Sequence, residues 1–338
     1  MALKLVMALR TAGNWALKEK FKKVNGGKGY LNTQRGIKMK KTTILRNLLK
    51  EPGLVVIPCV EDCLTARCAE AAGFKAACMA GSSMYDAVLG LPNIGLASAN
   101  EVINIMRYIA NSINIPLLVM GDDGFGPMFP AYRTTQEVIR AGAAGISISD
   151  RTPVVKTTAG HHVVEVLPRN EYLGKIGAVV EARDKEDKDF IIAARIDCGA
   201  KLGEEEVIAR AKACKVLGAD VIFALSAPSE PKSKEVGKEN LGQFYKKLGA
   251  PDVMIWGMGP DDLTAKDYQD IGTKIWVNGR IDFIVAEAAL DFYQKFHDTG
   301  TLPPQTFTAQ PGKGPAADYL QKLRGKGPWS EIEKRNTH

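Results

Sequence analysis

A short apolar run followed by a helical segment repeats eight times along this chain, and this rhythm constrains the fold more strongly than any other feature. The runs are apolar without interruption, as expected of parallel strands that are buried on both faces. We predict strands at residues 53–58, 76–81, 116–121, 145–149, 190–197, 220–225, 253–257 and 274–278. Eight strand–helix units over about 250 residues match the size of a (β/α)8 TIM barrel. The alternative is an open doubly wound sheet, although no G-x-G-x-x-G motif opens the first unit.

Each predicted strand is followed by a segment that we predict to be helical. These segments cover residues 61–74, 98–113, 134–142, 169–183, 203–218, 238–248, 264–272 and 282–296. Several of them end at a glycine, among them Gly73, Gly142 and Gly218, which is typical of helix C-termini.

The formal charge of +7 is concentrated at the N-terminus. Residues 1–50 hold 13 Lys and Arg and a single acid, Glu19, whereas the rest of the chain carries 37 acids and 32 bases. The body is therefore mildly acidic, which argues against nucleic acid as a partner. We predict a basic N-terminal extension at residues 1–44, a barrel domain at 45–300 and a C-terminal tail at 301–338.

Residues 1–38 have more than one interpretation. We favour a dispensable extension ahead of a start at Met39, but a basic amphipathic stretch is also typical of an organelle-targeting peptide or a membrane-surface helix. No apolar run approaches the roughly 18–20 residues of a membrane span. The six cysteines show no C-x-x-C pair, which indicates reduced thiols and a cytoplasmic location, with an organelle as the alternative if 1–38 is a transit segment.

Charged and polar side chains gather where the predicted strands end, which is the face that carries the active site of a TIM barrel. Asp122 and Asp123 follow the third strand, Ser149-Asp150-Arg151 follows the fourth, and Arg195 and Asp197 end the fifth. Because arginine binds anions such as carboxylates through paired hydrogen bonds, this mixture predicts a small anionic carboxylate or a phosphonate-like anion as the substrate.

Several stretches resemble the isocitrate lyase / phosphoenolpyruvate mutase superfamily, and most closely its 2-methylisocitrate lyase-like branch. They include "AEAAGFKAACMAGSSMYDAVLGLPNIGLASANEV", "IPLLVMGDDGFG", "AGAAGISISD" and "FIIAARID". The resemblance covers residues 45–297. It implies a (β/α)8 barrel, a homo-oligomer (tetramer or dimer), and chemistry that makes or breaks a C–C or P–C bond through an enolate held by Mg²⁺.

The chain departs from the family pattern around the expected Mg²⁺ site. The family groups four carboxylates there, but Met120, Asn93 and Ser149 stand at three of those positions. Asp122 remains and Asp123 is adjacent to it, so these two are the predicted metal ligands. A thioether is a poor ligand for a hard cation, which prefers oxygen.

The resemblance also implies roles for residues at the strand ends and in the loop after the fourth strand. The lyases carry a cysteine in that loop, whereas this chain reads "VVKTTAGHH" without one. The predicted catalytic residues are Lys156, His161 and Asp150, and the predicted substrate-binding residues are Gly81, Ser82, Ser83 and Arg195.

The resemblance implies a C–C bond lyase similar to 2-methylisocitrate lyase, acting on a small 2-hydroxy- or 2-oxo-carboxylate. Two alternatives remain open at this point. One is a divergent enzyme that needs no metal, or a phosphonate mutase or hydrolase. The other is a barrel that binds anions without catalysis.

Overall fold

A computed structural model describes residues 39–152, 165–224, 234–249, 252–256, 263–301 and 332–336. The chain divides into two compact units, Met1–Ile281 and Asp282–His338. The first unit contains all the strands described below. No helix of the described residues is long and apolar enough to cross a membrane. Residues 1–38 of the predicted extension at 1–44 and most of the predicted tail at 301–338 lie outside the described residues.

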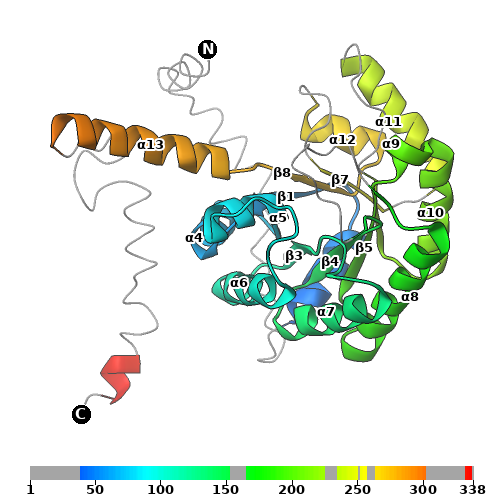
Figure 1. The fold of residues 1–338 in the computed structure, drawn as a ribbon, viewed down its shortest axis with the longest axis horizontal. Helices are drawn as coiled ribbons and strands as arrows, with labels where there is room; N and C mark the ends of the chain where they lie inside the picture. The colour runs from blue at the N-terminus through cyan, green and yellow to red at the C-terminus, as the bar shows by residue number, and fades with distance from the viewer. Residues whose placement is uncertain are drawn as a thin grey trace. The chain divides into compact units, whose positions relative to one another are not determined.

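Eight parallel strands close into a barrel in the order β1 to β8 (Figure 1). The strands are β1 Val55–Val60, β2 Ala77–Met79, β3 Leu117–Met120, β4 Gly145–Ser149, β5 Ile191–Ile196, β6 Val221–Ala224, β7 Val253–Trp256 and β8 Ile275–Asn278. The closing pair joins β8 to β1, with Val55 opposite Ile275 and Pro58 opposite Asn278. The predicted (β/α)8 barrel is confirmed, and every predicted strand overlaps an observed one.

Helices surround the strands, as expected for parallel crossovers (Figure 1). In the first unit they are α3 Lys41–Lys50, α4 Cys63–Ala71, α5 Gly81–Met84, α6 Ala99–Ser112, α7 Met128–Arg140, α8 Arg169–Glu186, α9 Gly199–Leu202, α10 Glu204–Val216, α11 Lys234–Leu248 and α12 Ala265–Ile271, with a π-helix at Tyr85–Leu89. Helix α13, Asp282–Thr299, belongs to the second unit.

Several helices differ from the predicted ranges: α11 begins at Lys234 rather than 238, and α5, α9 and the π-helix were not predicted. Helix α7 begins at Met128, ahead of the predicted start at residue 134, because Pro130 occupies its first turn, where a proline is tolerated. Helix α3 was not predicted, and it spans the predicted domain boundary between residues 44 and 45. Its Leu45 is buried in the same cluster as the barrel interior, so this helix packs against the barrel.

Side chains alternate between the barrel interior and the surrounding helices, and this alternation decides which residues reach the site. Leu118 and Met120 of β3 belong to the interior cluster, whereas Val119 belongs to the cluster between strands and helices. On β4, Ile148 lies on the helix side. Because the period is two residues, Ser149 continues the interior face of β4.

A substitution at Gly145, at the start of β4, can test how tightly the barrel wall is packed. A Cβ at this position would lie 2.9 Å from the Cβ and 2.9 Å from the carbonyl oxygen of Ile191. We expect Gly145→Ala to lower the free energy of unfolding by about 1–3 kcal/mol, because overpacking forces the backbone to shift. Gly174→Ala on α8 is the matched control, since nothing lies within 4 Å of its Cβ. Urea denaturation should show the control unchanged or more stable by about 0.5–1 kcal/mol, and equal stability of Gly145→Ala and wild type would contradict the packing argument.

Candidate active site

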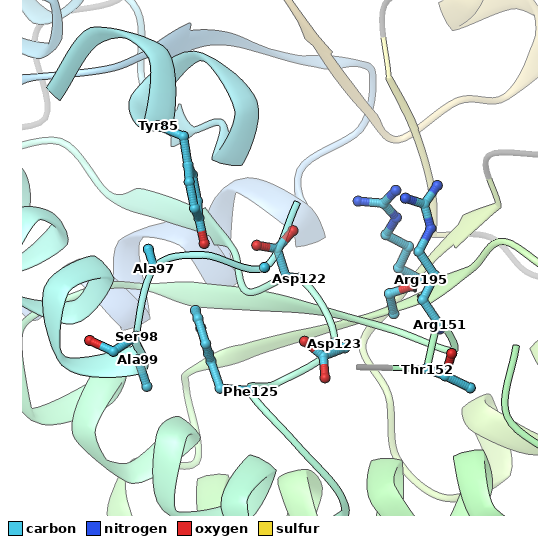
Figure 2. Close-up of a pocket in the computed structure, with 12 residues that line it drawn as sticks. Tyr85, Ala97, Ser98, Ala99, Asp122, Asp123, Phe125, Arg151, Thr152 and Arg195 are labelled. Atoms are coloured by element: carbon cyan, nitrogen blue, oxygen red, sulfur yellow. Dashed lines mark hydrogen bonds between the residues drawn. The ribbon is translucent and has the colours of Figure 1, made fainter. Parts of the chain in front are cut away.

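A cavity of about 320 Å³ opens at the carboxyl ends of β3, β4 and β5 (Figure 2). Its lining residues are Tyr85, Gly95, Ala97, Ser98, Ala99, Asp122, Asp123, Phe125, Ser149, Arg151, Thr152 and Arg195. Two carboxylates and two guanidinium groups therefore share one small space. This position agrees with the general location of active sites in TIM barrels.

The turn after β3 carries both acids and is tightly held. Asp122 has a left-handed backbone with φ of 47°, a conformation that is uncommon for a residue other than glycine. Its carbonyl oxygen accepts a hydrogen bond from Ser149 N at 2.7 Å, and the Asp123 carbonyl accepts one from Lys175 Nζ at 2.8 Å. Backbone strain that persists under such constraint is typical of functional sites.

Tyr85 lies beside the Asp122 carboxylate. Figure 2 shows its hydroxyl directed toward the turn that carries Asp122. Burial raises the pKa of Tyr85, and the negative charges of Asp122 and Asp123 and a hydrogen bond to Asp122 raise it further. The phenol therefore stays protonated near neutral pH and donates toward the carboxylate. Tyr85 begins a π-helical turn, a distortion that occurs frequently at functional sites.

The predicted substrate-binding stretch Gly81–Ser83 starts next to this carboxylate. A Cβ at Gly81 would lie 3.6 Å from Asp122 Oδ1 and 3.0 Å from Asn93 Nδ2, so the absence of a side chain leaves room there. Ser83 is buried, and its hydroxyl lies 3.5 Å from the Ala80 carbonyl oxygen. Neither Ser82 nor Ser83 lines the cavity.

The Asp197 carboxylate organises the opposite side of the cavity. Its Oδ2 accepts hydrogen bonds from Ser149 Oγ at 2.6 Å and from Arg195 Nε at 2.9 Å, and Arg151 Nε lies 3.0 Å from the same oxygen. Burial alone would raise the pKa of Asp197, but Arg195 and Arg151 outweigh it and lower the pKa below its ordinary value. The carboxylate therefore stays ionised and holds both arginines by their Nε atoms.

Arg195, predicted to bind substrate, lines the cavity. Its guanidinium carbon lies 5.5 Å from the ring centre of Phe223, an interior residue of β6. This geometry adds a cation–π contact to the ion pair with Asp197. The side chain is therefore fixed in position before any ligand arrives.

Asp150, predicted to be catalytic, faces away from the cavity. It follows Ser149 and so lies on the helix side of β4, where it is fully buried. Its carboxylate accepts hydrogen bonds from Arg210 Nη1 at 3.0 Å and from Asp197 N at 2.8 Å. Burial raises the pKa of Asp150 to about 6, with Arg210 opposing that rise. The structure thus places Asp150 where it supports the end of β5, and we do not retain it as a group that touches substrate.

The sequence did not point to every residue that lines the cavity, and two of the predicted catalytic residues cannot be compared with the structure. The predicted catalytic residues Lys156 and His161 lie outside the described residues, so their roles stay predictions. Tyr85 and Phe125 line the cavity without having been singled out. Tyr85 comes one helical turn after Gly81, so the helical spacing from the strand end was a usable signal.

The described residues do not fit a resident Mg²⁺ ion. Met120 points into the barrel and offers only a thioether, and the Ser149 hydroxyl donates to Asp197. Within the ranges that the structure describes, no cluster of three or more His, Cys, Asp or Glu side chains could hold a metal. Arg151 also brings a positive charge into the same cavity. Of the carboxylates, only Asp122 and Asp123 line the cavity, so a hard cation would depend on water for its other oxygen ligands.

Comparisons with known proteins agree with this geometry. A family model described as phosphoenolpyruvate phosphomutase matches residues 45–293. The petal death protein of Dianthus caryophyllus is 38% identical over 205 residues, which cover 60% of this chain and 63% of that protein. The 2-methylisocitrate lyase of Aeropyrum pernix is 31% identical over 236 residues, which cover 69% of this chain and 71% of that protein. This chain therefore spans less than two thirds of the length of the petal death protein.

Among solved structures, that of oxaloacetate acetylhydrolase in complex with the inhibitor 3,3-difluorooxalacetate is similar, with a TM-score of 0.73 and 26% identity. The match covers 87% of this chain and 96% of the solved chain. The sequence and structure comparisons thus agree on the same type of barrel.

Arg210→Gln tests the ion pair behind β4. Removing the guanidinium leaves the buried Asp150 carboxylate without its charge partner, which should lower the free energy of unfolding by about 3–5 kcal/mol near pH 8. The cost should shrink toward pH 5. A carboxyl whose folded pKa lies above its unfolded pKa gains stability as the pH falls through the folded value, and the variant raises that value above about 6. Denaturation at both pH values measures this.

The double variant Asp150→Asn/Arg210→Gln is the control, because its asparagine carries no charge to compensate. A cost for Arg210→Gln that did not change with pH, or that was as large in the Asp150→Asn background, would contradict the assigned pairing.

Proposed function

Since this chain belongs to the phosphoenolpyruvate phosphomutase family, we propose that it is a carbon–carbon lyase for a small 2-hydroxy- or 2-oxo-carboxylate. The observation that carries the proposal is the pair of guanidinium groups on Asp197, which share one cavity with the Asp122 carboxylate. An anion binder and a base in one enclosed space are what such a cleavage needs. Two similar proteins, 2-methylisocitrate lyase and oxaloacetate acetylhydrolase, are named for small carboxylates of this class.

Arg195 is the proposed ligand of the substrate carboxylate. Its Nε is occupied by Asp197 at 2.9 Å, which leaves the two terminal nitrogens for a ligand. A carboxylate presents two oxygens in one plane and so matches a guanidinium fork. A cavity of about 320 Å³ suits a small acid, because it lies near the lower end of the range for ligand pockets.

Asp122 is the proposed base. It takes the proton from the C2 hydroxyl of a 2-hydroxy acid, or of the hydrate of a 2-oxo acid, and the Tyr85 hydroxyl orients the carboxylate for that transfer. The C2–C3 bond then breaks, the C2 alkoxide becomes a carbonyl, and the bonding electron pair moves to C3, where a neighbouring carboxylate delocalises it as an enolate. A 2-hydroxy acid thus gives a 2-oxo acid and the hydrate of a 2-oxo acid gives oxalate, and in both cases C3 takes up a proton to give a second carboxylic acid.

The proton that C3 takes up is assigned to the loop after β4. Lys156 and His161 are the proposed donors there, on the resemblance alone. The homo-oligomeric state and the cytoplasmic or organellar location likewise stay predictions.

Arg195→Gln tests the carboxylate site. We expect kcat/KM to fall on the order of 10–100-fold, because the variant loses a charge-assisted hydrogen bond to the substrate. Release of a 2-oxo acid from 2-methylisocitrate and 2,3-dimethylmalate, and release of oxalate from oxaloacetate, measure it. Arg107→Gln, on the exposed surface of α6, is the matched control. Failure of the wild-type protein to cleave any of the three substrates would contradict the proposed lyase.

Asp122→Asn tests the base. The amide cannot accept the hydroxyl proton, so kcat should fall by about 10²–10⁴-fold, while affinity for oxalate changes far less than in Arg195→Gln. Single-turnover assays and titration calorimetry with oxalate separate the two effects. Asp184→Asn, half-exposed on α8, is the matched control. Unchanged kcat in Asp122→Asn would move the role of the base to another group.

A further inference from the structure

Arg151 is a charged residue of the cavity that has so far been placed among the strand-end residues but has no individual role. It directly follows β4, and its side chain is 16% exposed. Its backbone is fixed on both sides, because its N–H donates to Ser149 Oγ at 3.1 Å and the residue forms an isolated antiparallel bridge with Val166. The side chain is therefore delivered to the cavity by ordered backbone.

Arg151 and Arg195 share one carboxylate oxygen and so present two forks side by side. Their Nε atoms lie 3.0 Å and 2.9 Å from Asp197 Oδ2. Figure 2 shows the two guanidinium groups adjacent to one another. Within the part of the chain that the structure describes, their terminal nitrogens donate no hydrogen bond to protein. Two neighbouring forks match a ligand with oxygens on adjacent carbons.

The charge on this side of the cavity favours an anion over a cation. On this side of the cavity the single Asp197 carboxylate faces two guanidinium groups, while the carboxylates of Asp122 and Asp123 line another part of the cavity. Burial lowers the pKa of Arg151, and repulsion from the positive charge of Arg195 lowers it further. A bound oxyanion relieves that repulsion, whereas a divalent cation at the same place adds to it.

We infer that Arg151 binds and stabilises the oxyanion that forms beside the substrate carboxylate, in the place of a bound divalent cation. The inference rests on the proposed function. Arg195 takes the carboxylate, and Arg151 takes the alkoxide oxygen on the adjacent carbon as the proton leaves for Asp122. A guanidinium is suited to this task because it remains charged throughout the physiological pH range. Oxalate, with oxygens on two adjacent carbons, copies this arrangement.

The test is titration calorimetry with oxalate on the full chain, in the presence of a chelator and then with Mg²⁺. Wild type should bind oxalate equally well in both conditions, within about 3-fold. Arg151→Gln should weaken binding by about 10–100-fold with chelator present, because a charge-assisted contact is lost. Arg151→Lys keeps the positive charge but loses the two-pronged guanidinium, so its affinity for oxalate should lie between those of wild type and Arg151→Gln. Arg107→Gln should match wild type.

Oxalate binding by wild type that requires Mg²⁺ would overturn the inference, and this result needs no variant to fold. Wild-type affinity in a folded Arg151→Gln protein, as judged by its melting curve, would overturn it too. Turnover that a chelator abolishes and Mg²⁺ restores would leave the lyase standing and remove the role of Arg151. Metal-free oxalate binding through Arg151 without any turnover would instead remove the lyase and keep Arg151 as an anion ligand.

Discussion

The buried carboxylate of Asp197 is the group on which the rest of the site depends. A charge taken out of water is costly unless it is paired and hydrogen-bonded, so this carboxylate must keep its partners. Its Oδ2 gathers Ser149, Arg195 and Arg151 from the ends of two neighbouring strands. The same oxygen therefore stabilises the fold and aims two cations at the ligand space.

The arrangement extends from the cavity to the helices through the backbone of Asp197. Its N–H donates to Asp150, and Asp150 pairs with Arg210 of α10. Arg210 in turn donates to Glu206 and to the carbonyl of Leu167, close to the start of α8. Each charged group in this network of four side chains has a partner of opposite sign. Such pairing explains how several ionised groups can lie together with little exposure to solvent.

The sequence predicted the fold well because a barrel repeats one unit. Eight buried strands separated by glycine-terminated helices leave few alternatives, and the strand ranges follow from the apolar runs. Whether Asp150 lies on the interior side or the helix side of β4 was harder to predict. Strands that are buried on both faces are apolar on both faces, so their alternation is weak. On β4 a signal did exist, since Ser147 and Ser149 alternate with Ile146 and Ile148. That pattern puts Asp150 on the isoleucine side, away from the cavity.

The ligand chemistry of the site could not be predicted from Met120, Asn93 and Ser149 alone, because the loss of acids does not say what replaces them. The answer depends on which oxygen Arg151 reaches, and that depends on how Asp197 is oriented by a neighbouring strand. Once Asp197 holds two guanidinium groups, a positive charge is built into the wall of the cavity. In the proposed site a cation would then meet this positive charge, so the absence of the acids and the presence of Arg151 act in the same direction. The substitutions are therefore best understood as one change in the charge balance of the site rather than as separate losses.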